Sequence, residues 1–272
     1  MKIGITERGD AACNFAWVDK CEKHEVDGAV IITKKLTKEV RDNLLKLYKS
    51  GFPLILHATI TGYGGSNLEP NVWEYEKSVK ALKTLINNGF PTSHIVIRID
   101  PMFPGVFGMQ RVKKLMYHLQ EQGLFETGNE IRLRMSIYDE YPHVRERVKK
   151  LNLSPMYGGA FQPSKSMIDH LVASLHDIRE TLNALPNTTV PVFETCAEDM
   201  LSKEYPQEYI QRGCISETDI NIMGFSPEMI RLYTEENKQN RRGCHCLTVK
   251  TELLTERKQC PHGCIYCYWK NE

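Results

Sequence analysis

The stretch that decides the fold is residues 54–61, Leu-Ile-Leu-His-Ala-Thr-Ile-Thr, in which His57, Thr59 and Thr61 alternate with apolar side chains. Alternation of this kind predicts a β-strand with its polar side chains on one face. Two later segments share the pattern: Ile95–Asp100 with Arg98 and Asp100, and Ile131–Ile137 with Arg132, Arg134 and Ser136. Several predicted strands therefore have one polar face.

Helix-like segments separate the predicted strands. Apolar residues recur at helical spacing in four segments: Val40/Leu44/Leu47, Val79/Leu82/Leu85/Ile86, Val112/Leu115/Met116/Leu119 and Ile168/Leu171/Leu175/Ile178/Leu182. Gly51, Gly89 and Gly123 follow the first three segments and are suitable helix stops. The predicted strands are Ile3–Thr6, Ala29–Thr33, Leu54–Thr61, Ile95–Asp100, Ile131–Ile137, Val190–Phe193 and Ile220–Met223. This alternation predicts an α/β fold built from parallel strands with right-handed connections.

The polar strand faces discriminate between parallel architectures. Parallel strands covered by helices on both sides normally read as continuous apolar runs. A barrel whose lumen holds a polar ligand explains the polar faces. The alternative is a set of edge strands with one face exposed to solvent. A fully closed barrel would fill its centre with Val, Ile and Leu. We therefore expect a partial, open (β/α) barrel of the TIM type with the site inside it.

The composition is that of a soluble protein without a strong charge bias. The chain has 272 residues, and its 35 Lys and Arg nearly cancel its 34 Asp and Glu, so charge does not predict nucleic-acid or membrane binding. We expect a single domain over residues 1–272, with the barrel in 1–195 and a cysteine-rich part in 196–272. With no export signal at the N-terminus, nine cysteines predict metal binding or catalysis in a reducing cytoplasm.

The most specific motif is Cys260-Pro-His-Gly-Cys264-Ile-Tyr-Cys267, a C-x-x-x-C-x-x-C spacing. Three thiolates this close together can bind three corners of a 4Fe-4S cluster and leave the fourth iron without a protein ligand. Zinc is an alternative, with Cys264/Cys267 and Cys244/Cys246 as two ligand pairs. Structural zinc sites favour C-x-x-C pairs, which Cys264/Cys267 is, whereas the Cys244/Cys246 pair is tighter and less usual. A group of buried free thiols is the third interpretation.

Four further cysteines lie in the last third of the chain: Cys196, Cys214, Cys244 and Cys246. Four thiolates could close a second iron–sulfur cluster or a zinc site. Free cysteine is also among the most buried residue types, so some of the four could simply fill the core. Cys13 and Cys21 fall in an apparent helix, Ala11 to His24, where core packing is the better prediction.

The tail motif, with Tyr266 before Cys267, resembles the signature of the radical S-adenosylmethionine (SAM) enzymes. In that family the open iron chelates SAM, which is cleaved reductively to a 5′-deoxyadenosyl radical. The resemblance implies a radical SAM domain with Tyr266 near the adenine. It also makes a group of residues at the strand ends candidates for holding SAM: Thr59, Thr61, Gly62, Arg98 and Asp100.

The chain also resembles a bacterial and phage family with a radical-SAM-like cysteine cluster at the C-terminus. Displaced by one strand, the same motifs are similar to spore photoproduct lyase, which repairs a thymine dimer. This implies a circular permutation that moves the cluster-bearing first strand and its loop to the C-terminus. The resemblance rests on these motifs: Arg8 and Asp10, Ile32-Thr33-Lys34, residues 59–64, Leu68-Glu69-Pro70-Asn71, Arg98-Ile99-Asp100-Pro101, residues 138–141, Cys196-Ala197-Glu198, residues 241–246 and Cys260–Tyr268.

The remaining candidates concern the substrate. Arg8, Arg132, Arg134 and Tyr138 are candidate substrate-binding residues, although the two strand arginines could equally pair with Asp100, Asp139 or Glu194. Tyr141 and Asp139 are the candidate catalytic residues, with Tyr141 a possible hydrogen-atom donor.

The resemblance implies a radical reaction on a nucleobase or nucleic acid, a repair, modification or isomerisation of a thymine-type base. DNA or a modified nucleotide would then be the partner, and a flavodoxin- or ferredoxin-type protein the electron donor. A peptide or a small metabolite is the alternative substrate. A non-catalytic iron–sulfur or zinc protein is the rival class.

Overall fold

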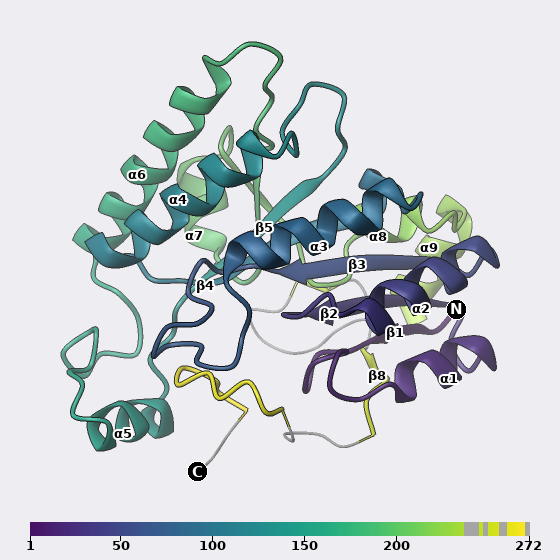
Figure 1. Cartoon of the computed structure of the whole chain (residues 1–272), viewed down its shortest axis with the longest axis horizontal. Coiled ribbons are helices and arrows are strands. Elements are labelled where there is room, and N and C mark those ends of the chain that lie inside the picture. The colour runs from purple at the N-terminus through teal and green to yellow at the C-terminus, as the bar shows by residue number, and fades with distance from the viewer. Residues whose placement is uncertain (237–244, 247–249, 256–259, 270–272) are drawn as a thin grey trace.

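Eight parallel strands form one sheet in this protein, and they follow one another in space almost as they do in sequence. The computed structural model describes residues 1–236, 245–246, 250–255 and 260–269 (Figure 1). The strands are β1 (Ile3–Ile5), β2 (Gly28–Thr33), β3 (Leu54–Thr59), β4 (Ile95–Met102), β5 (Arg132–Ile137), β6 (Phe193–Thr195), β7 (Tyr209–Gln211) and β8 (Thr251–Glu252). Their order is β7-β6-β5-β4-β3-β2-β1-β8, so β8 joins the sheet beside β1. The predicted α/β fold with a parallel sheet is confirmed.

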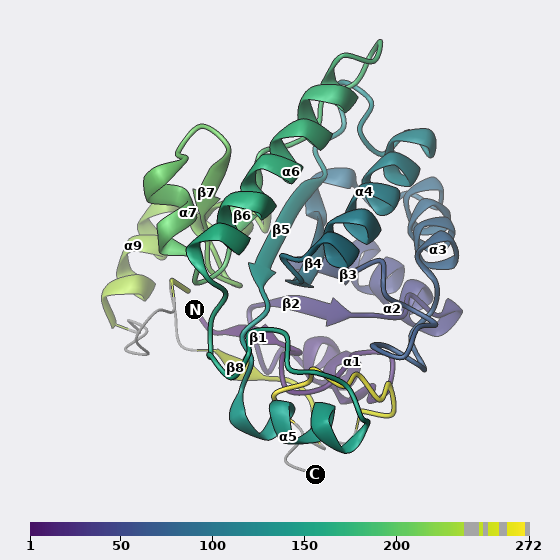
Figure 2. The same ribbon diagram turned by 90° about the vertical axis from the view of Figure 1, so that its left-hand side faces the viewer.

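One face of the sheet is covered by helices (Figure 2). Helices of both faces are found in the described residues: α1 (Ala16–Glu22), α2 (Lys38–Lys49), α3 (Tyr75–Asn87), α4 (Val106–Glu121), α5 (Pro142–Lys150), α6 (Lys165–Asn183), α7 (Asp199–Glu204), α8 (Glu217–Ile222) and α9 (Pro227–Glu236). The apolar stripes of α2, α3, α4 and α6 form the main core with the sheet, as their spacing predicts. Gly51, Gly89 and Gly123 follow α2, α3 and α4 with positive φ, which confirms the predicted helix stops. No helix in the described ranges is long and apolar enough to cross a membrane.

The other face of the sheet divides into an apolar half and a polar half. Ile5, Val30 and Ile55 pack there against residues 214–230, which include α8. Toward the carboxyl ends of the strands, Arg98 pairs in register with Thr59 on one side and Arg134 on the other. A polar inner face of this kind is consistent with the expected partial, open barrel.

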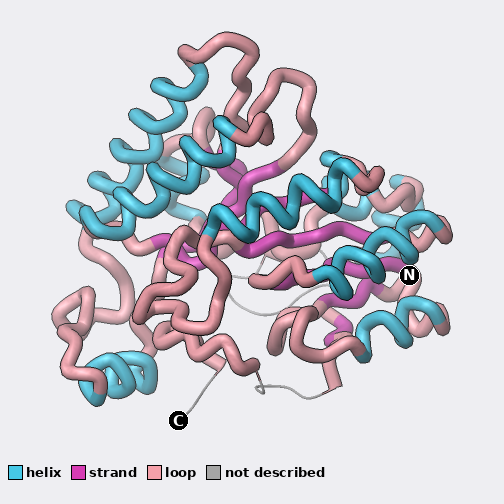
Figure 3. Tube along the Cα trace, in the orientation of Figure 1, coloured by secondary structure: helices cyan, strands magenta, loops and turns pink. Residues whose placement is uncertain are grey.

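Figure 3 shows how helices and strands alternate along the described chain, and three of the sequence predictions for these elements are wrong. Residues 220–223, predicted as a strand, belong to α8 and its C-terminal cap. Ser216 starts that helix with a capping box, because its hydroxyl accepts from Asp219 N–H and the Asp219 carboxylate accepts from Ser216 N–H. The segment predicted as Val190–Phe193 forms a strand only from Phe193, and the helix predicted from Ala11 begins at Ala16. The short strands β7 and β8 were not predicted.

Candidate functional site

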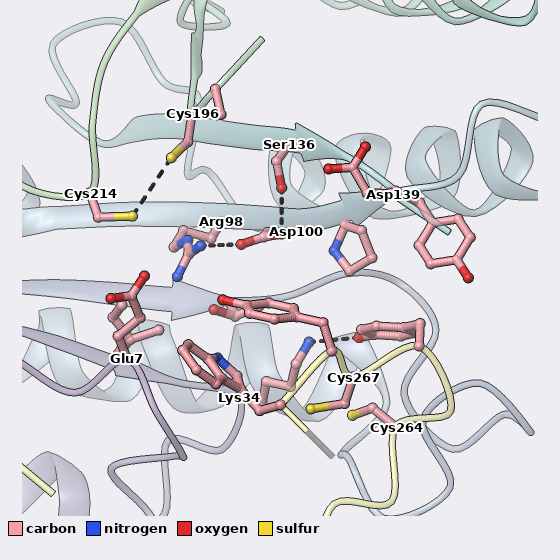
Figure 4. Close-up of a pocket in the computed structure, with 18 of the residues that line it drawn as sticks. Glu7, Lys34, Arg98, Asp100, Ser136, Asp139, Cys196, Cys214, Cys264 and Cys267 are labelled. Atoms are coloured by element: carbon pink, nitrogen blue, oxygen red, sulfur yellow. Dashed lines mark hydrogen bonds and ion pairs between the residues drawn. The ribbon is translucent and has the colours of Figure 1, made fainter. Parts of the chain in front are cut away.

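A cavity of about 770 Å³ opens at the carboxyl ends of β2 to β6 (Figure 4). The carboxyl ends of parallel strands are where open α/β sheets and barrels place their ligands. The tail loop closes one side of this cavity, and the turns after the strands form the others. The predicted site residues that line it are Arg8, Thr59, Arg98, Asp100, Tyr138, Asp139, Tyr141, Tyr266, Cys196, Cys214, Cys260, Cys264 and Cys267.

Backbone hydrogen bonds hold the tail cysteine loop against two distant segments. Ile265 N–H donates to the Leu68 carbonyl (3.1 Å), and Asn71 N–H donates to the His262 carbonyl (3.2 Å). On the other side, Arg147 of α5 donates to the carbonyls of Ile265 and Cys267, at 2.8 and 3.0 Å. The loop is thus fixed by its backbone, which leaves its cysteine side chains available to the cavity.

A buried network links the tail loop to the ends of β2 and β3. Lys34 Nζ donates to Glu69 Oε1 (2.8 Å) and to the Tyr266 hydroxyl (2.9 Å), while Tyr266 donates to Glu69. Burial lowers the pKa of Lys34, but the charges of Glu69, Cys264 and Asp100 together with the hydrogen bond to Glu69 outweigh burial and raise this pKa above its usual value. Burial raises the pKa of Cys264 to about 12, and the Lys34 charge opposes the rise. Lys34 is therefore the cation that favours a thiolate at Cys264.

Two of the predicted SAM-binding residues support this network from outside the cavity lining. Thr61 donates to Glu69 Oε2 (2.7 Å), so it orients the carboxylate that holds Lys34 and Tyr266. Gly62 has φ +81°, and a Cβ there would lie 3.1 Å from the Arg111 carbonyl oxygen. Glycine is needed for this backbone turn. The structure thus gives Thr61 and Gly62 positioning roles.

The end of β4 carries a second polar group that faces the cavity. Arg98 forms an ion pair with Asp100, and Ser136 of β5 donates to the other oxygen of that carboxylate (2.5 Å). Their side chains point into the pocket in Figure 4. The pair therefore offers both a cation and a carboxylate to a ligand at this wall.

Arg132 and Arg134 lie elsewhere than the substrate prediction required. Neither lines the cavity. Arg134 donates to Glu194 Oε2 (2.9 Å) and to Asp219 Oδ2 (3.3 Å), and Arg132 donates to Asp219 Oδ1 (2.7 Å). The guanidinium groups are thus already neutralised by buried carboxylates, and the alternative pairing interpretation fits them. His57 is fully buried and 3.2 Å from Arg134, as expected for a core histidine.

A comparison with protein families bears on this geometry. Residues 13–269 match the family described as "Domain of unknown function (DUF1848)". The chain belongs to this family. A search of curated proteins gives no match.

In this member of the DUF1848 family, a strained turn after β6 presents a carboxyl group to the cavity. Ala197 has φ +64°, a value that costs energy for a residue with a Cβ. The next residue, Glu198, lines the cavity and accepts a hydrogen bond from Ile137 N–H (2.7 Å). Burial, with smaller contributions from Asp139 and Asp100, raises the pKa of Glu198 to about 7.

This raised pKa predicts a pH-dependent stability. Below the usual pKa of 4.5 the neutral Glu198 is favoured by the fold, and this contribution is lost as pH rises through about 7. Glu198→Gln removes the group that becomes charged. The free energy of unfolding of this variant, relative to that of the native protein, should therefore increase by on the order of 2 kcal/mol from pH 5 to pH 8. Urea unfolding at both pH values measures this, with exposed Glu39→Gln as the control. Equal increases for both variants would contradict the prediction.

The four further cysteines are partly brought together. Cys196 Sγ lies 3.7 Å from Cys214 Sγ, and Cys214 N–H donates to Cys246 Sγ (3.1 Å). Cys196 and Cys214 line the cavity, whereas Cys246 is buried behind it. Cys244 lies outside the described residues.

A different group of potential metal ligands involves the tail loop. Cys13, Cys260 and His262 each place a donor atom within 4.8 Å of the other two. Asp10 Oδ2 contacts His262 Nε2 (2.9 Å), and Cys13 Sγ lies 4.0 Å from the same nitrogen. With Asp10 on Nε2, it is the buried Nδ1 of His262, which has no hydrogen-bond partner among the described residues, that could bind a metal. The prediction that Cys13 packs in the core is wrong, because the residue is exposed in a turn before α1, whereas Cys21 is buried as predicted.

Sequence reasoning assigned no role to several groups that the fold brings to the site. Lys34, Glu69 and Glu198 stood in the motifs of the family resemblance without a function. Lys34 directly follows a strand, and Glu198 follows one by three residues. Position after a parallel strand was therefore the signal available for both.

Proposed function

We propose that this protein is a radical SAM enzyme. The observation that carries the proposal is that Cys260, Cys264 and Cys267, in the C-x-x-x-C-x-x-C spacing, line one cavity together. Its volume of about 770 Å³ falls in the range of about 300–1,000 Å³ usual for ligand and cofactor sites.

The residues present fit an iron–sulfur cluster with an open iron. Thiolates are the ligands such clusters use, and the tail loop offers three of them with the Lys34 cation beside Cys264. Each thiolate of a cubane binds a different iron, so the three sulfurs need not converge on one point. Bound together, the cluster and SAM would supply a 5′-deoxyadenosyl radical that takes a hydrogen atom from the substrate.

The protein's own groups would hold and shield that cofactor. Tyr266, fixed by Glu69 and Lys34, would form the wall beside the adenine. The charged pair Arg98 and Asp100 would bind the polar ends of SAM, since an arginine fork suits a carboxylate. Tyr138 and Tyr141 line the cavity farther from β2 and would exclude water from the reacting atoms.

The place of β8 supports a permuted radical SAM barrel. β8 pairs in parallel with β1 at the edge of the sheet, and the cysteine loop follows β8 in the chain. If β8 were counted as the first strand, the whole sheet would run in sequential order, with the cluster loop after strand one. That is the arrangement expected if the first strand of such a barrel moved to the C-terminus.

For the substrate we propose a nucleobase of thymine type, in DNA or as a modified nucleotide. Support comes from aromatic rings in the cavity lining. Tyr141 and Tyr268 stack with centroids 5.5 Å apart, and the Arg8 guanidinium lies 5.4 Å from the Trp269 ring centroid. Flat rings and a cation together suit a planar, anionic ligand. A flavodoxin- or ferredoxin-type protein would supply the electron.

Anaerobic reconstitution tests the proposal. With iron, sulfide and a strong reductant, the protein should turn brown, bind about four iron atoms at the tail loop and form 5′-deoxyadenosine from SAM. A thymine-containing oligonucleotide should bind to the same preparation. Iron-free protein that leaves SAM intact would overturn the enzymatic proposal.

A mononuclear metal protein is the second candidate, because Cys13, Cys260 and His262 converge. Cys13→Ala separates the two candidates, since Cys13 lies outside the radical SAM motif. For the radical SAM enzyme, the variant should keep its iron and form 5′-deoxyadenosine within about twofold of the native rate, as for a peripheral substitution. Loss of one bound zinc without any effect on iron would support the mononuclear site.

A further inference from the structure

A second group of thiols lies across the cavity from the tail loop (Figure 4). We propose that Cys196, Cys214 and Cys246 bind a single thiophilic metal ion, zinc, at a site separate from the tail cysteines. The site stands on its own geometry and does not require the tail loop to carry a cluster.

The fold brings these cysteines together from three separate segments. Cys196 directly follows β6 and Cys214 comes three residues after β7, and these adjacent parallel strands pair Thr195 with Gln211. Cys246 joins them because Gly213 has no side chain. A Cβ at Gly213 would lie 2.4 Å from the Cys246 nitrogen, so only glycine permits this backbone approach.

The sulfur geometry favours one ion over a second cubane. With a Zn–S bond of about 2.3 Å, two sulfurs of a tetrahedral site lie about 3.8 Å apart. Cys196 Sγ and Cys214 Sγ are 3.7 Å apart, whereas a cubane would hold them on separate irons and farther apart. Cys214 N–H donates to Cys246 Sγ, which places the third cysteine beside Cys214. The three sulfurs do not all lie within 4.8 Å of one another, so metal binding would require rotation of a cysteine side chain.

The surroundings of these cysteines combine access to the cavity with nearby cations. Cys196 and Cys214 line the cavity, and they also border the apolar cluster that contains Val30 and Ile55. Two partly buried cations also act on these sulfurs, Arg98 on Cys196 and Cys214, and Lys250 on Cys214 and Cys246. Each of these cations also pairs with one carboxylate, Arg98 with Asp100 and Lys250 with Glu7. Three thiolates around a divalent ion carry one net negative charge, which these cations would offset.

The test starts from the full chain with Cys260→Ala, Cys264→Ala and Cys267→Ala, which removes the tail cluster and the Cys260 donor of the other metal group. Purified after growth with zinc, this variant should contain about one zinc per chain. Adding Cys214→Ala should remove it, whereas adding Cys21→Ala, at another buried thiol, should not. Cobalt substitution of the tail variant should give an intense thiolate-to-cobalt charge-transfer band, a readout that does not depend on the folding of the Cys214 variant.

Three results would overturn the inference. They are zinc that survives Cys214→Ala, about four iron atoms per chain in the tail variant, and a metal-free protein with a Cys196–Cys214 disulfide found by mass spectrometry. The proposed radical chemistry fails separately, because it depends on 5′-deoxyadenosine formation by the native tail loop.

Discussion

Replacing Cys264 by alanine is expected to abolish 5′-deoxyadenosine formation. Cys264 is the central cysteine of the tail motif, it is 7% exposed, and Lys34 lies beside it. Even outer-shell substitutions at metal sites typically cost 10- to 100-fold, so loss of a direct ligand should cost more than about 100-fold in rate. The iron content of the reconstituted tail site should fall in parallel.

Cys21→Ala provides the matched control for this experiment. Cys21 is a buried thiol in α1, and it does not line the cavity. Its variant should keep both iron and product formation, with at most a modest loss of stability. If Cys264→Ala formed 5′-deoxyadenosine at the native rate, the assignment of the cluster to the tail loop would be wrong.

The position of the cavity followed from sequence because its signals are local. Alternation in residues 54–61 and the helix stops at Gly51 and Gly89 depend on neighbours in the chain, and both predicted the structure correctly. Parallel strands then place their carboxyl ends together, so the polar residues at those ends had to meet.

Pairing across the fold was not predictable in the same way. The Lys34–Glu69–Tyr266 network joins positions up to 232 residues apart, and no periodicity encodes that distance. Residues 220–223 were predicted as a strand and form a helix, although their signal is local. A short, mainly apolar segment fits a strand or a helix equally well. The capping box formed by Ser216 and Asp219 stabilises the start of the helix. Asp219 is also the buried ion-pair partner of Arg134.

Arg134→Met is expected to have the largest effect on stability, about 3–5 kcal/mol of lost free energy of unfolding. Arg134 is 1% exposed and donates to both Glu194 and Asp219, which are themselves buried. Methionine would fill the space but leave these carboxylates with less compensating charge. Equilibrium unfolding in urea measures the loss, and Lys38→Met, which breaks an exposed pair with Asp42, should cost only about 0.5 kcal/mol or less.

The pH dependence of this loss separates electrostatics from packing. Burial raises the pKa of Asp219, but the charges of Arg134 and Arg132 outweigh it and hold this pKa below its usual value of 3.8. The contribution of Asp219 is therefore present above about pH 4 and is lost as pH falls through the lowered pKa. The difference between native protein and Arg134→Met should be largest near pH 7 and shrink in acid. A difference in the free energy of unfolding that stays constant from pH 7 to pH 3 would show that Arg134 acts by packing alone. The polar inner face of the sheet would then be stabilised by side-chain packing and not by charge.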